Sequence, residues 1–395
     1  MSSTEQPLYL EVSRKIEARI TTGSWRADER IPGVREIAEE HQVSVVTASR
    51  ALQVLRDKGI IKSVERSGSY LIPKLTQADE SWALCFCITP GPWQKASHAV
   101  AMEGFEALGR RGVARFLTNA ITLDSAESPQ EIKRQVRRAM ESGIKGLFCL
   151  PSRIDEESLA RDERLLQACR ELGLPVVLIE RNLRGNAREL EWDLVGPDDF
   201  EGGVRCTEHL QEVGRKRIAF VQGGPTSSHN DRMAGYLFAS LKAQRVDPNI
   251  VGHAPPTLLE FRHDLPSKQA YCLLAERVIE SEADGVICFQ DTTAMGLILE
   301  LLARGKRIPD EVAITGFDDL PIGNSFSIGV TTYTLDSVTV AQRALEIMRY
   351  RIANPDAKPV RVLVPGELIR RESSCTSAAV DSPDWRPTMQ IGFGA

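Results

Sequence analysis

Between residues 31 and 62, apolar residues recur every three or four positions in two short segments, the spacing that places them on one face of a helix. The first segment has Val34, Ile37 and Ala38, with His41 on the same face, and the second has Ala48, Ala51, Leu52 and Leu55. Residues 42–44 separate the segments; Ser44 is suited to cap the second helix and Gly59 to end it. The pattern predicts two helices joined by a tight turn, a shape that fits a DNA groove.

A helix is predicted before this pair and a hairpin after it. Every fourth residue is apolar from residue 8, which predicts an amphipathic helix ending near Gly23. Its apolar residues are Leu8, Val12, Ile16 and Ile20. Ile60–Val64 and Tyr70–Ile72 are β-like, and Glu65–Gly68 between them has the composition of a hairpin turn. The N-terminal segment is thus predicted to hold three helices and a wing.

From Ala83 onward, short apolar runs alternate with amphipathic segments. Strand candidates in the first half are ALCFCIT, RFLTN, GLFCL and PVVLIE, and those in the second half are RIAFVQ, GVICFQ and VAITGF. Continuous apolar strands alternating with helices predict an α/β fold with parallel sheets covered on both faces. Because the pattern occurs twice, we expect two lobes with a cleft between them, and ligands bind at the strand ends that face such a cleft.

Composition and charge narrow the class of protein. With 395 residues and 42% hydrophobic content, the chain has room for two or three domains and a substantial core. The start lacks a basic segment followed by an apolar run, and no later window is apolar over a bilayer-spanning length, so we expect a cytoplasmic protein with no membrane partner. The net charge is −5, but residues 1–74 hold twelve Lys and Arg against ten Asp and Glu, a slight basic excess at the N-terminal end.

Eight cysteines are present, and most lie inside apolar runs, among them Cys85, Cys87, Cys149 and Cys288. Cys85 and Cys87 would point to opposite faces of one strand. We expect buried free thiols rather than disulfides or metal ligands.

The order of elements and the segments PLYLEVSRKIEARITTGSW, ERIPGVREIAEEHQVS, TASRALQVLRDKGII and SGSYLI resemble the GntR-type winged helix-turn-helix over residues 7–73. The resemblance implies that double-stranded operator DNA is the partner. The residues it places at the DNA are Arg35, Ser44, Thr47 and the wing residues Arg66, Ser67 and Gly68. Phosphate contacts from such arginine and serine side chains fix register, and wing residues can enter the minor groove.

The second helix departs from the family at two positions. The family usually has arginines where this chain has Val45 and Ser49. Arginine donates two hydrogen bonds to guanine, so guanine readout from this helix is not expected. Arg50, one position later, is a candidate for a phosphate contact; solvated surface is the alternative for each of these DNA residues.

Residues 84–373 resemble the LacI/GalR effector domain, a relative of the periplasmic sugar-binding proteins. The segments that carry the resemblance are EHLQEVGRKRIAFVQG, NDRMAGY, DGVICFQDTTAMGLILELLARGKRIPDEVAITGFDDLP and VTTYTLDSVTVAQRALEIMRYRI. The implied fold is a two-lobed, periplasmic-binding-protein-like domain. A GntR-type reader joined to a LacI-type sensor is the layout of bacterial arabinose repressors.

The family's ligand residues transfer to a few positions of this chain. Arg232 in DRMAGY matches an arginine that hydrogen-bonds the ligand, and Asp318 in GFDD matches an aspartate that accepts from sugar hydroxyls. Gln290 and Glu180 stand where asparagine and aspartate are usual, each one methylene longer. Trp93 offers an aromatic face for a sugar ring. A structural ion pair is the alternative for Asp318 and Arg232, and a core or surface position is the alternative for Trp93.

These inferences predict four parts of the chain. They are a DNA-binding domain at 1–74, a linker at 75–82, an effector-binding and dimerisation domain at 83–375 and a weakly ordered tail at 376–395. The expected protein is a homodimeric transcriptional regulator, a repressor, whose operator affinity changes when a small sugar closes the cleft.

An enzyme is the main alternative, because GntR-type readers also occur fused to pyridoxal-phosphate aminotransferase-like domains. That class needs a lysine placed for the cofactor and a larger domain of different pattern, and neither is seen. The chain also lacks G-x-S-x-G, H-E-x-x-H, a G-x-x-x-x-G-K phosphate loop and paired C-x-x-C spacings. We therefore expect no catalytic residues, no cofactor and no metal site. A transport binding protein is disfavoured by the missing export signal and by the helix-turn-helix.

Overall fold

The structure is a computed structural model of the 395-residue chain. It describes residues 8–21, 31–57, 61–64, 68–71, 80–86, 92–121, 128–152, 156–184, 190–224, 226–246, 255–324 and 327–375. The chain divides into two compact units, one of residues 1–81 with 106–116 and the other of 82–105 with 117–395. Most of the predicted linker and all of the predicted tail lie outside the described residues, and the predicted domain boundaries stay predictions.

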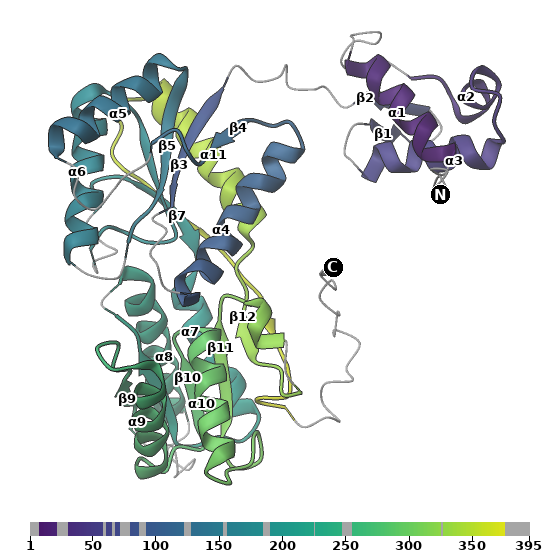
Figure 1. Ribbon diagram of the computed structural model, residues 1–395. Coiled ribbons are helices and arrows are strands. Elements are labelled where there is room, and N and C mark those ends of the chain that lie inside the picture. The colour runs from purple at the N-terminus through teal and green to yellow at the C-terminus, as the bar shows by residue number, and fades with distance from the viewer. Residues whose placement is uncertain are drawn as a thin grey trace, which may run out of the picture. The chain divides into compact units, whose positions relative to one another are not determined.

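The N-terminal unit contains the predicted three helices and wing (Figure 1). The elements are α1 (Leu8–Thr21), α2 (Val34–Glu40), α3 (Val45–Asp57), β1 (Ile61–Val64) and β2 (Gly68–Leu71). The two strands pair antiparallel, with Ile61 opposite Leu71 and Val64 opposite Gly68. Most of the helical faces predicted from sequence form the core, whose buried residues include Val12, Ile16, Ile37, Ala48, Ala51, Leu52 and Leu55. Leu8, predicted on the apolar face of the first helix, is instead 53% exposed at the start of α1, and the side chain of Ile20 lies outside the described part of the chain.

Local hydrogen bonds define where α2 and α3 begin. The backbone N–H of Gly33 donates to Glu36 Oε2 at 2.5 Å ahead of α2. The backbone N–H of Thr47 donates to Ser44 Oγ at 3.1 Å, so Ser44 caps α3 as predicted. Gly59, predicted to end this helix, lies outside the described residues.

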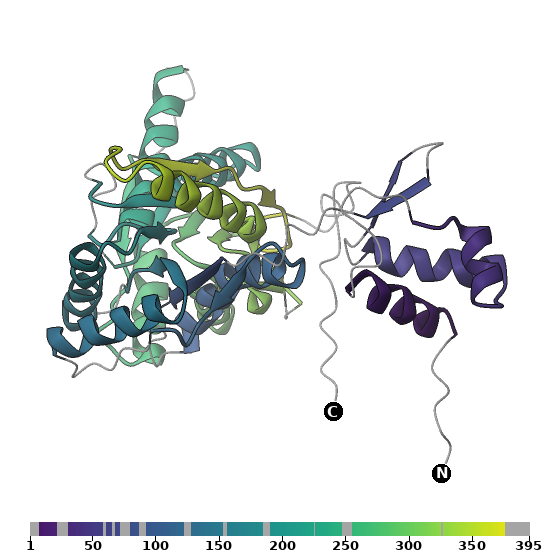
Figure 2. The ribbon, with the colours of Figure 1, turned by 90° about the horizontal axis from the view of Figure 1, so that it is seen from above.

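The first lobe of the α/β region is built on a six-stranded sheet of order β13-β7-β6-β5-β3-β4. Its strands are β3 (Ser81–Phe86), β4 (Arg115–Leu117), β5 (Ile144–Leu150), β6 (Val176–Ile179), β7 (Asp193–Pro197) and β13 (Arg361–Val364). Its helices are α4 (Pro92–Arg110), α5 (Pro129–Glu141), α6 (Glu156–Leu172) and α11 (Ser337–Ala353). Helices α5 and α6 pack together, whereas α11 lies against β6 and β7 on the other side of the strands (Figure 2).

The second lobe has a six-stranded sheet of order β14-β12-β11-β10-β8-β9. Its strands are β8 (Ile218–Gln222), β9 (Thr257–Glu260), β10 (Gly285–Cys288), β11 (Ala313–Phe317), β12 (Thr331–Tyr333) and β14 (Leu368–Ile369). Its helices are α7 (Asp199–Glu212), α8 (Ser227–Val246), α9 (Ser267–Glu280) and α10 (Asp291–Ala303). All strand pairs are parallel except β12 with β14. The predicted α/β class with two lobes and parallel sheets is confirmed.

The chain passes between the lobes three times, after β7, after β12 and after β13. Backbone hydrogen bonds tie these passages together: Asp198 N–H donates to the Val364 carbonyl and Thr334 N–H to the Glu367 carbonyl, both at 2.8 Å. The Gly366 N–H also donates to Tyr333 Oη at 2.8 Å. As a result α11, which follows the second half of the sequence, covers the sheet of the first lobe.

Two expectations from composition bear on the described residues. Cys85, Cys149 and Cys288 are buried free thiols, as predicted, and Cys87 lies outside the described residues. Among the helices described, none has the length and apolar character required to cross a lipid bilayer.

Candidate functional site

Close packing of α7 on α8 brings two charged residues together. A Cβ at Gly203 would lie 2.1 Å from the carbonyl oxygen of Arg232, and a Cβ at Gly235 would lie 2.1 Å from the carbonyl oxygen of Phe200. Only glycine permits so close an approach of the two backbones. Asp199 in the first turn of α7 therefore lies beside Arg232 in the second turn of α8.

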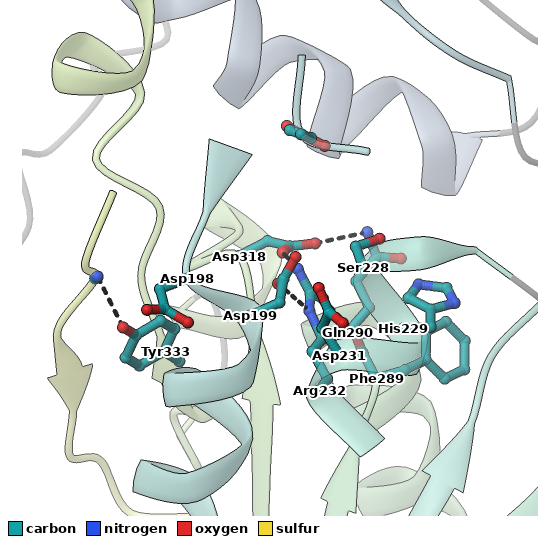
Figure 3. A network of polar contacts seen from close by, with 12 residues as sticks. Asp198, Asp199, Ser228, His229, Asp231, Arg232, Phe289, Gln290, Asp318 and Tyr333 are labelled. Carbon is teal, nitrogen blue, oxygen red and sulfur yellow. Dashed lines mark hydrogen bonds and ion pairs between the residues drawn. The ribbon is translucent and has the colours of Figure 1, made fainter. Parts of the chain in front are cut away.

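Arg232 is the centre of a buried polar network in the second lobe (Figure 3). Its Nε donates to Asp199 Oδ1 at 2.6 Å, its Nη1 to the Phe289 carbonyl at 2.6 Å, and its Nη2 to Asp318 Oδ1 at 2.8 Å. The guanidinium carbon also lies 4.4 Å from the centre of the Phe317 ring. Every guanidinium nitrogen thus has a protein partner.

The protonation of this network follows from its burial and its charges. Burial opposes the charged form of Arg232, but the carboxylates of Asp199 and Asp318 hold its pKa above the ordinary value. Burial raises the pKa of Asp199 to about 7, although Arg232 acts in the opposite direction. The guanidinium therefore stays charged at neutral pH and orients both aspartates.

Gln290 completes the network from the end of β10. Its Nε2 donates to Asp318 Oδ2 at 3.1 Å, and its Oε1 accepts from Thr292 Oγ1 at 3.1 Å. Each carboxylate oxygen of Asp318 thus accepts one hydrogen bond from the protein. Because a carboxylate has about four acceptor positions, each oxygen keeps capacity for a ligand hydroxyl.

Two acidic residues that directly follow strands, Asp318 and Glu180, have strained backbone conformations. Asp318 after β11 has φ +89° and Glu180 after β6 has φ +63°, in the left-handed region that few residues other than glycine adopt. Gly196 in β7 accommodates Glu180, because a Cβ there would lie 2.8 Å from the Glu180 carbonyl oxygen. Such strain costs about 1–3 kcal/mol per residue and is concentrated at functional sites.

The first lobe contributes Glu180 and a buried arginine, Arg181, which is 1% exposed. Arg181 Nε donates to the Pro151 carbonyl at 3.0 Å. Its Nη2 lies 3.7 Å from Glu180 Oε2 and has no hydrogen-bond partner among the described residues. Burial lowers the pKa of Arg181, while the charges of Glu180 and Asp318 counteract it. An unsatisfied donor on a buried cation makes Arg181 a candidate ligand residue.

The structure can be compared with the predicted effector residues. It brings Arg232, Gln290 and Asp318 together, and it places Glu180 at a strand end of the other lobe. The ion pair expected under the structural alternative for Arg232 and Asp318 is present, so their contact with a ligand stays a prediction. Trp93 lies in the first turn of α4, and its side chain lies outside the described part of the chain.

Sequence reasoning missed two residues of this site, Asp199 and Arg181. Arg181 adjoins Glu180 in the LIERN segment, so its position after a strand was a usable signal. Asp199 lies 33 positions from Arg232, and no local pattern indicated that the two would pair.

The described residues among the predicted DNA contacts lie on α2, at the N-cap and in the first two turns of α3, and at the start of β2. Arg35 and Arg50 are exposed, and neither forms an ion pair within the described residues. Ser44 and Thr47 are engaged with each other, their hydroxyl oxygens 2.8 Å apart. Gly68 begins β2 with φ +113°. The wing residues Arg66 and Ser67 lie outside the described residues.

Comparisons with known proteins agree with this architecture. Residues 8–71 match the family of bacterial regulatory proteins named gntR, and residues 207–374 match a periplasmic binding protein-like domain. The arabinose metabolism transcriptional repressor of Geobacillus stearothermophilus is 25% identical over 378 residues, covering 95% of this chain and 99% of that protein. The ribose operon repressor of Halalkalibacterium halodurans is 26% identical over 345 residues, covering 86% of this chain and 96% of that protein.

Solved structures show the same fold. A LacI family transcriptional regulator from Enterococcus faecium with bound ribose superposes with a TM-score of 0.55 at 21% identity, covering 75% of this chain and 98% of that one. The regulator CelR in complex with cellobiose superposes with a TM-score of 0.56 at 20% identity, covering 93% of this chain and 98% of that one. The chain therefore carries a domain of the gntR family of bacterial regulatory proteins at residues 8–71 and a periplasmic binding protein-like domain at residues 207–374.

Proposed function

We propose that this protein is a transcriptional repressor whose affinity for operator DNA is changed by a small sugar bound between the lobes. The observation that carries the proposal is the buried Arg232 network, which lies at strand ends of a LacI-type domain fused to a gntR-family reader. The relatives that match along most of the chain are repressors, and two structural neighbours contain a bound sugar.

A neutral sugar suits the charges and hydrogen-bonding groups of the site. Asp318 and Glu180 offer acceptors for ligand hydroxyls, and Arg181 offers Nη2, a donor with no hydrogen-bond partner among the described residues. The two arginines and three aspartate and glutamate side chains of the site nearly neutralise each other, so a ligand with paired hydroxyls fits better than a strongly charged one.

The two lobes contact each other next to the Arg232 network, and these contacts offer a route by which ligand binding could be coupled to operator affinity. The Asn182 backbone N–H in the first lobe donates to Ser227 Oγ at the start of α8, at 2.9 Å. Arg361 on β13 pairs with Asp231, the residue before Arg232. A ligand held by both lobes favours the arrangement in which these contacts form, and it shifts operator affinity if the DNA-bound state has a different arrangement.

Operator recognition is proposed to require two copies of the chain. Two chains associate through the α/β region, and their winged helices read two related half-sites. The protein acts in the cytoplasm, where a bacterial operator is accessible. A monomer that binds operator with full affinity at micromolar concentration would contradict the dimer.

We infer that the chain has no enzymatic activity. The competing class is an aminotransferase-like enzyme, which would carry pyridoxal phosphate. The absorbance spectrum of the purified protein separates the two classes, because the bound cofactor absorbs in the near ultraviolet or visible region.

Operator binding in the presence of sugars tests the proposed function. An operator is first selected from random duplex DNA with the full chain. A panel of neutral pentoses, hexoses and disaccharides is then screened for thermal stabilisation, since a ligand specific to the folded state raises stability. A sugar that binds is expected to change operator affinity about 5- to 150-fold. If no sugar in the panel stabilises the protein or changes operator affinity, the effector assignment fails.

A further inference from the structure

Two adjacent valines stand exposed at the start of the recognition helix α3. Val45 is 54% exposed and Val46 is 65% exposed, while the opposite face of the helix is buried in the domain core. Single exposed apolar residues are ordinary on protein surfaces. Two β-branched residues at the first two positions of a recognition helix are notable because these positions face the base edges when such a helix enters the major groove.

The polar groups at this end of α3 are few or already engaged. Ser44 accepts from the Thr47 backbone N–H, and its hydroxyl also bonds the Thr47 hydroxyl. The helix carries no lysine or arginine before Arg50. The groups that commonly donate to guanine O6 and N7 are therefore missing from the first turn, which leaves apolar contact as its principal means of reading bases.

The major groove offers one apolar group to such a surface, the 5-methyl group of thymine. Arg35 and Arg50 lie exposed on α2 and α3 and form no ion pair with described residues, so they can hold phosphates on either side of the contact. We propose that Val45 and Val46 read thymine methyl groups, so that each operator half-site has A·T pairs where α3 begins. The inference rests on the proposed DNA-binding function and specifies the bases that this function selects.

Thymine-to-uracil replacement tests the proposal on the full chain, because deoxyuridine lacks only the 5-methyl group. Each thymine of the selected operator is replaced in turn, and binding is measured by fluorescence anisotropy. We expect one or two positions per half-site to weaken binding about fourfold, the factor that corresponds to one buried methyl group. Replacement at the other thymines is expected to have no effect.

Variants then assign the effect to the valines. V45A and V46A are expected to bind the thymine operator less tightly and to lose sensitivity to uracil at the same positions, whereas V46T, which keeps a methyl group, retains part of it. L8A is the matched control, because Leu8 is a 53% exposed apolar residue on α1 of the same unit. It should leave both affinity and uracil sensitivity unchanged, and circular dichroism melting confirms that each variant is folded.

The outcomes distinguish the two levels of the proposal. A selected operator whose affinity is unchanged by uracil at every position would overturn the thymine readout and leave the regulator assignment in place. Uracil sensitivity that is unchanged at every position in both V45A and V46A would also overturn it. If the full chain selects no DNA sequence at all, the proposed function and the thymine readout fail together.

Discussion

Arg232 Nη2 and Asp318 Oδ1 lie 2.8 Å apart in a buried ion pair that joins α8 to the end of β11. The same guanidinium also neutralises Asp199. Replacement of Arg232 by alanine would leave the buried carboxylate of Asp318 without its cation, which typically costs about 3–5 kcal/mol. We expect R232A to lower the free energy of unfolding by that amount, measured by urea denaturation.

The exposed pair of Arg205 and Glu201 provides the control, since the two side chains pair at 2.7 Å but are 59% and 37% exposed. R205A should cost less than about 1 kcal/mol. Equal losses for R232A and R205A would show that the buried network contributes no more than a surface pair.

A milder change separates the effector role from stability. In Q290N the shorter amide would no longer reach Asp318 Oδ2, which Gln290 now contacts at 3.1 Å. The loss of one hydrogen bond to a carboxylate costs about 1.5–3 kcal/mol, which is less than the stability of a typical domain, so folding should survive. If Asp318 binds the effector, its altered orientation should weaken effector affinity about 3- to 10-fold, measured by isothermal titration calorimetry. Unchanged affinity would argue against Asp318 as a ligand residue.

Local pattern was enough to predict most of the elements but not their long-range arrangement. Apolar spacing identified α3 and the buried strands, because burial of one face or both faces leaves a direct mark on the sequence. The apolar spacing within α11 predicts an amphipathic helix but does not indicate which lobe the helix covers. Its place on the first lobe depends on the passage after β12, which no periodicity records.

The residues of the candidate site were also predicted only in part. Arg232, Gln290 and Asp318 were identified through resemblance, and the structure brings them together. Asp199 was not identified, because its pairing depends on the approach of α7 to α8 that Gly203 and Gly235 allow. Pairing across helices is a property of packing rather than of spacing along the chain.

That approach of α7 to α8 can be tested directly. In G203A the new Cβ would lie 2.1 Å from the Arg232 carbonyl oxygen, so α8 would have to move. Overpacking of this kind costs about 1–3 kcal/mol, and here it would also displace Arg232 from Asp318. We expect G203A to be destabilised and to bind the effector at least 10-fold more weakly.

G214A is the matched control for this variant. Gly214 has φ +86°, but a Cβ there meets no atom within 4 Å. Its alanine variant should be destabilised by about 1 kcal/mol through backbone strain and should keep effector affinity. Loss of effector affinity in both variants would indicate a general effect of destabilisation rather than displacement of Arg232.

The stability of the second lobe is expected to depend on pH through His209. Its Nε2 bonds Ser374 Oγ at 2.7 Å, and burial, aided by the charge of Arg370, lowers its pKa to about 4. A histidine that stays neutral in the folded state but binds a proton near pH 6.5 when unfolded contributes stability above pH 6.5, and this stability is lost as the pH falls toward 4. The full loss corresponds to about 3 kcal/mol.

Urea denaturation at pH 7 and at pH 5 measures this dependence. H209Q should show a smaller difference between the two pH values than the unaltered chain, because its side chain does not titrate. H263Q, at an exposed position, serves as the control and should retain the full difference. A pH dependence that is the same in all three proteins would exclude His209 as its source.

The predicted DNA surface can be tested through its salt dependence. Arg35 is exposed on α2 and forms no ion pair with the described residues, so it is available for a phosphate. Each phosphate contact adds about 0.9 to the slope of log affinity against log salt concentration, because counterions are released on binding. R35A should therefore weaken operator and nonspecific DNA binding alike and reduce the slope by about 1.

E39A is the control, because Glu39 is exposed on the same helix. Its slope should stay within about 0.3 of the original value, which is roughly a third of the change expected for one phosphate contact. A slope that is unchanged in R35A would remove Arg35 from the DNA surface and leave the exposed Arg50 as the remaining described candidate on α3 for a phosphate contact.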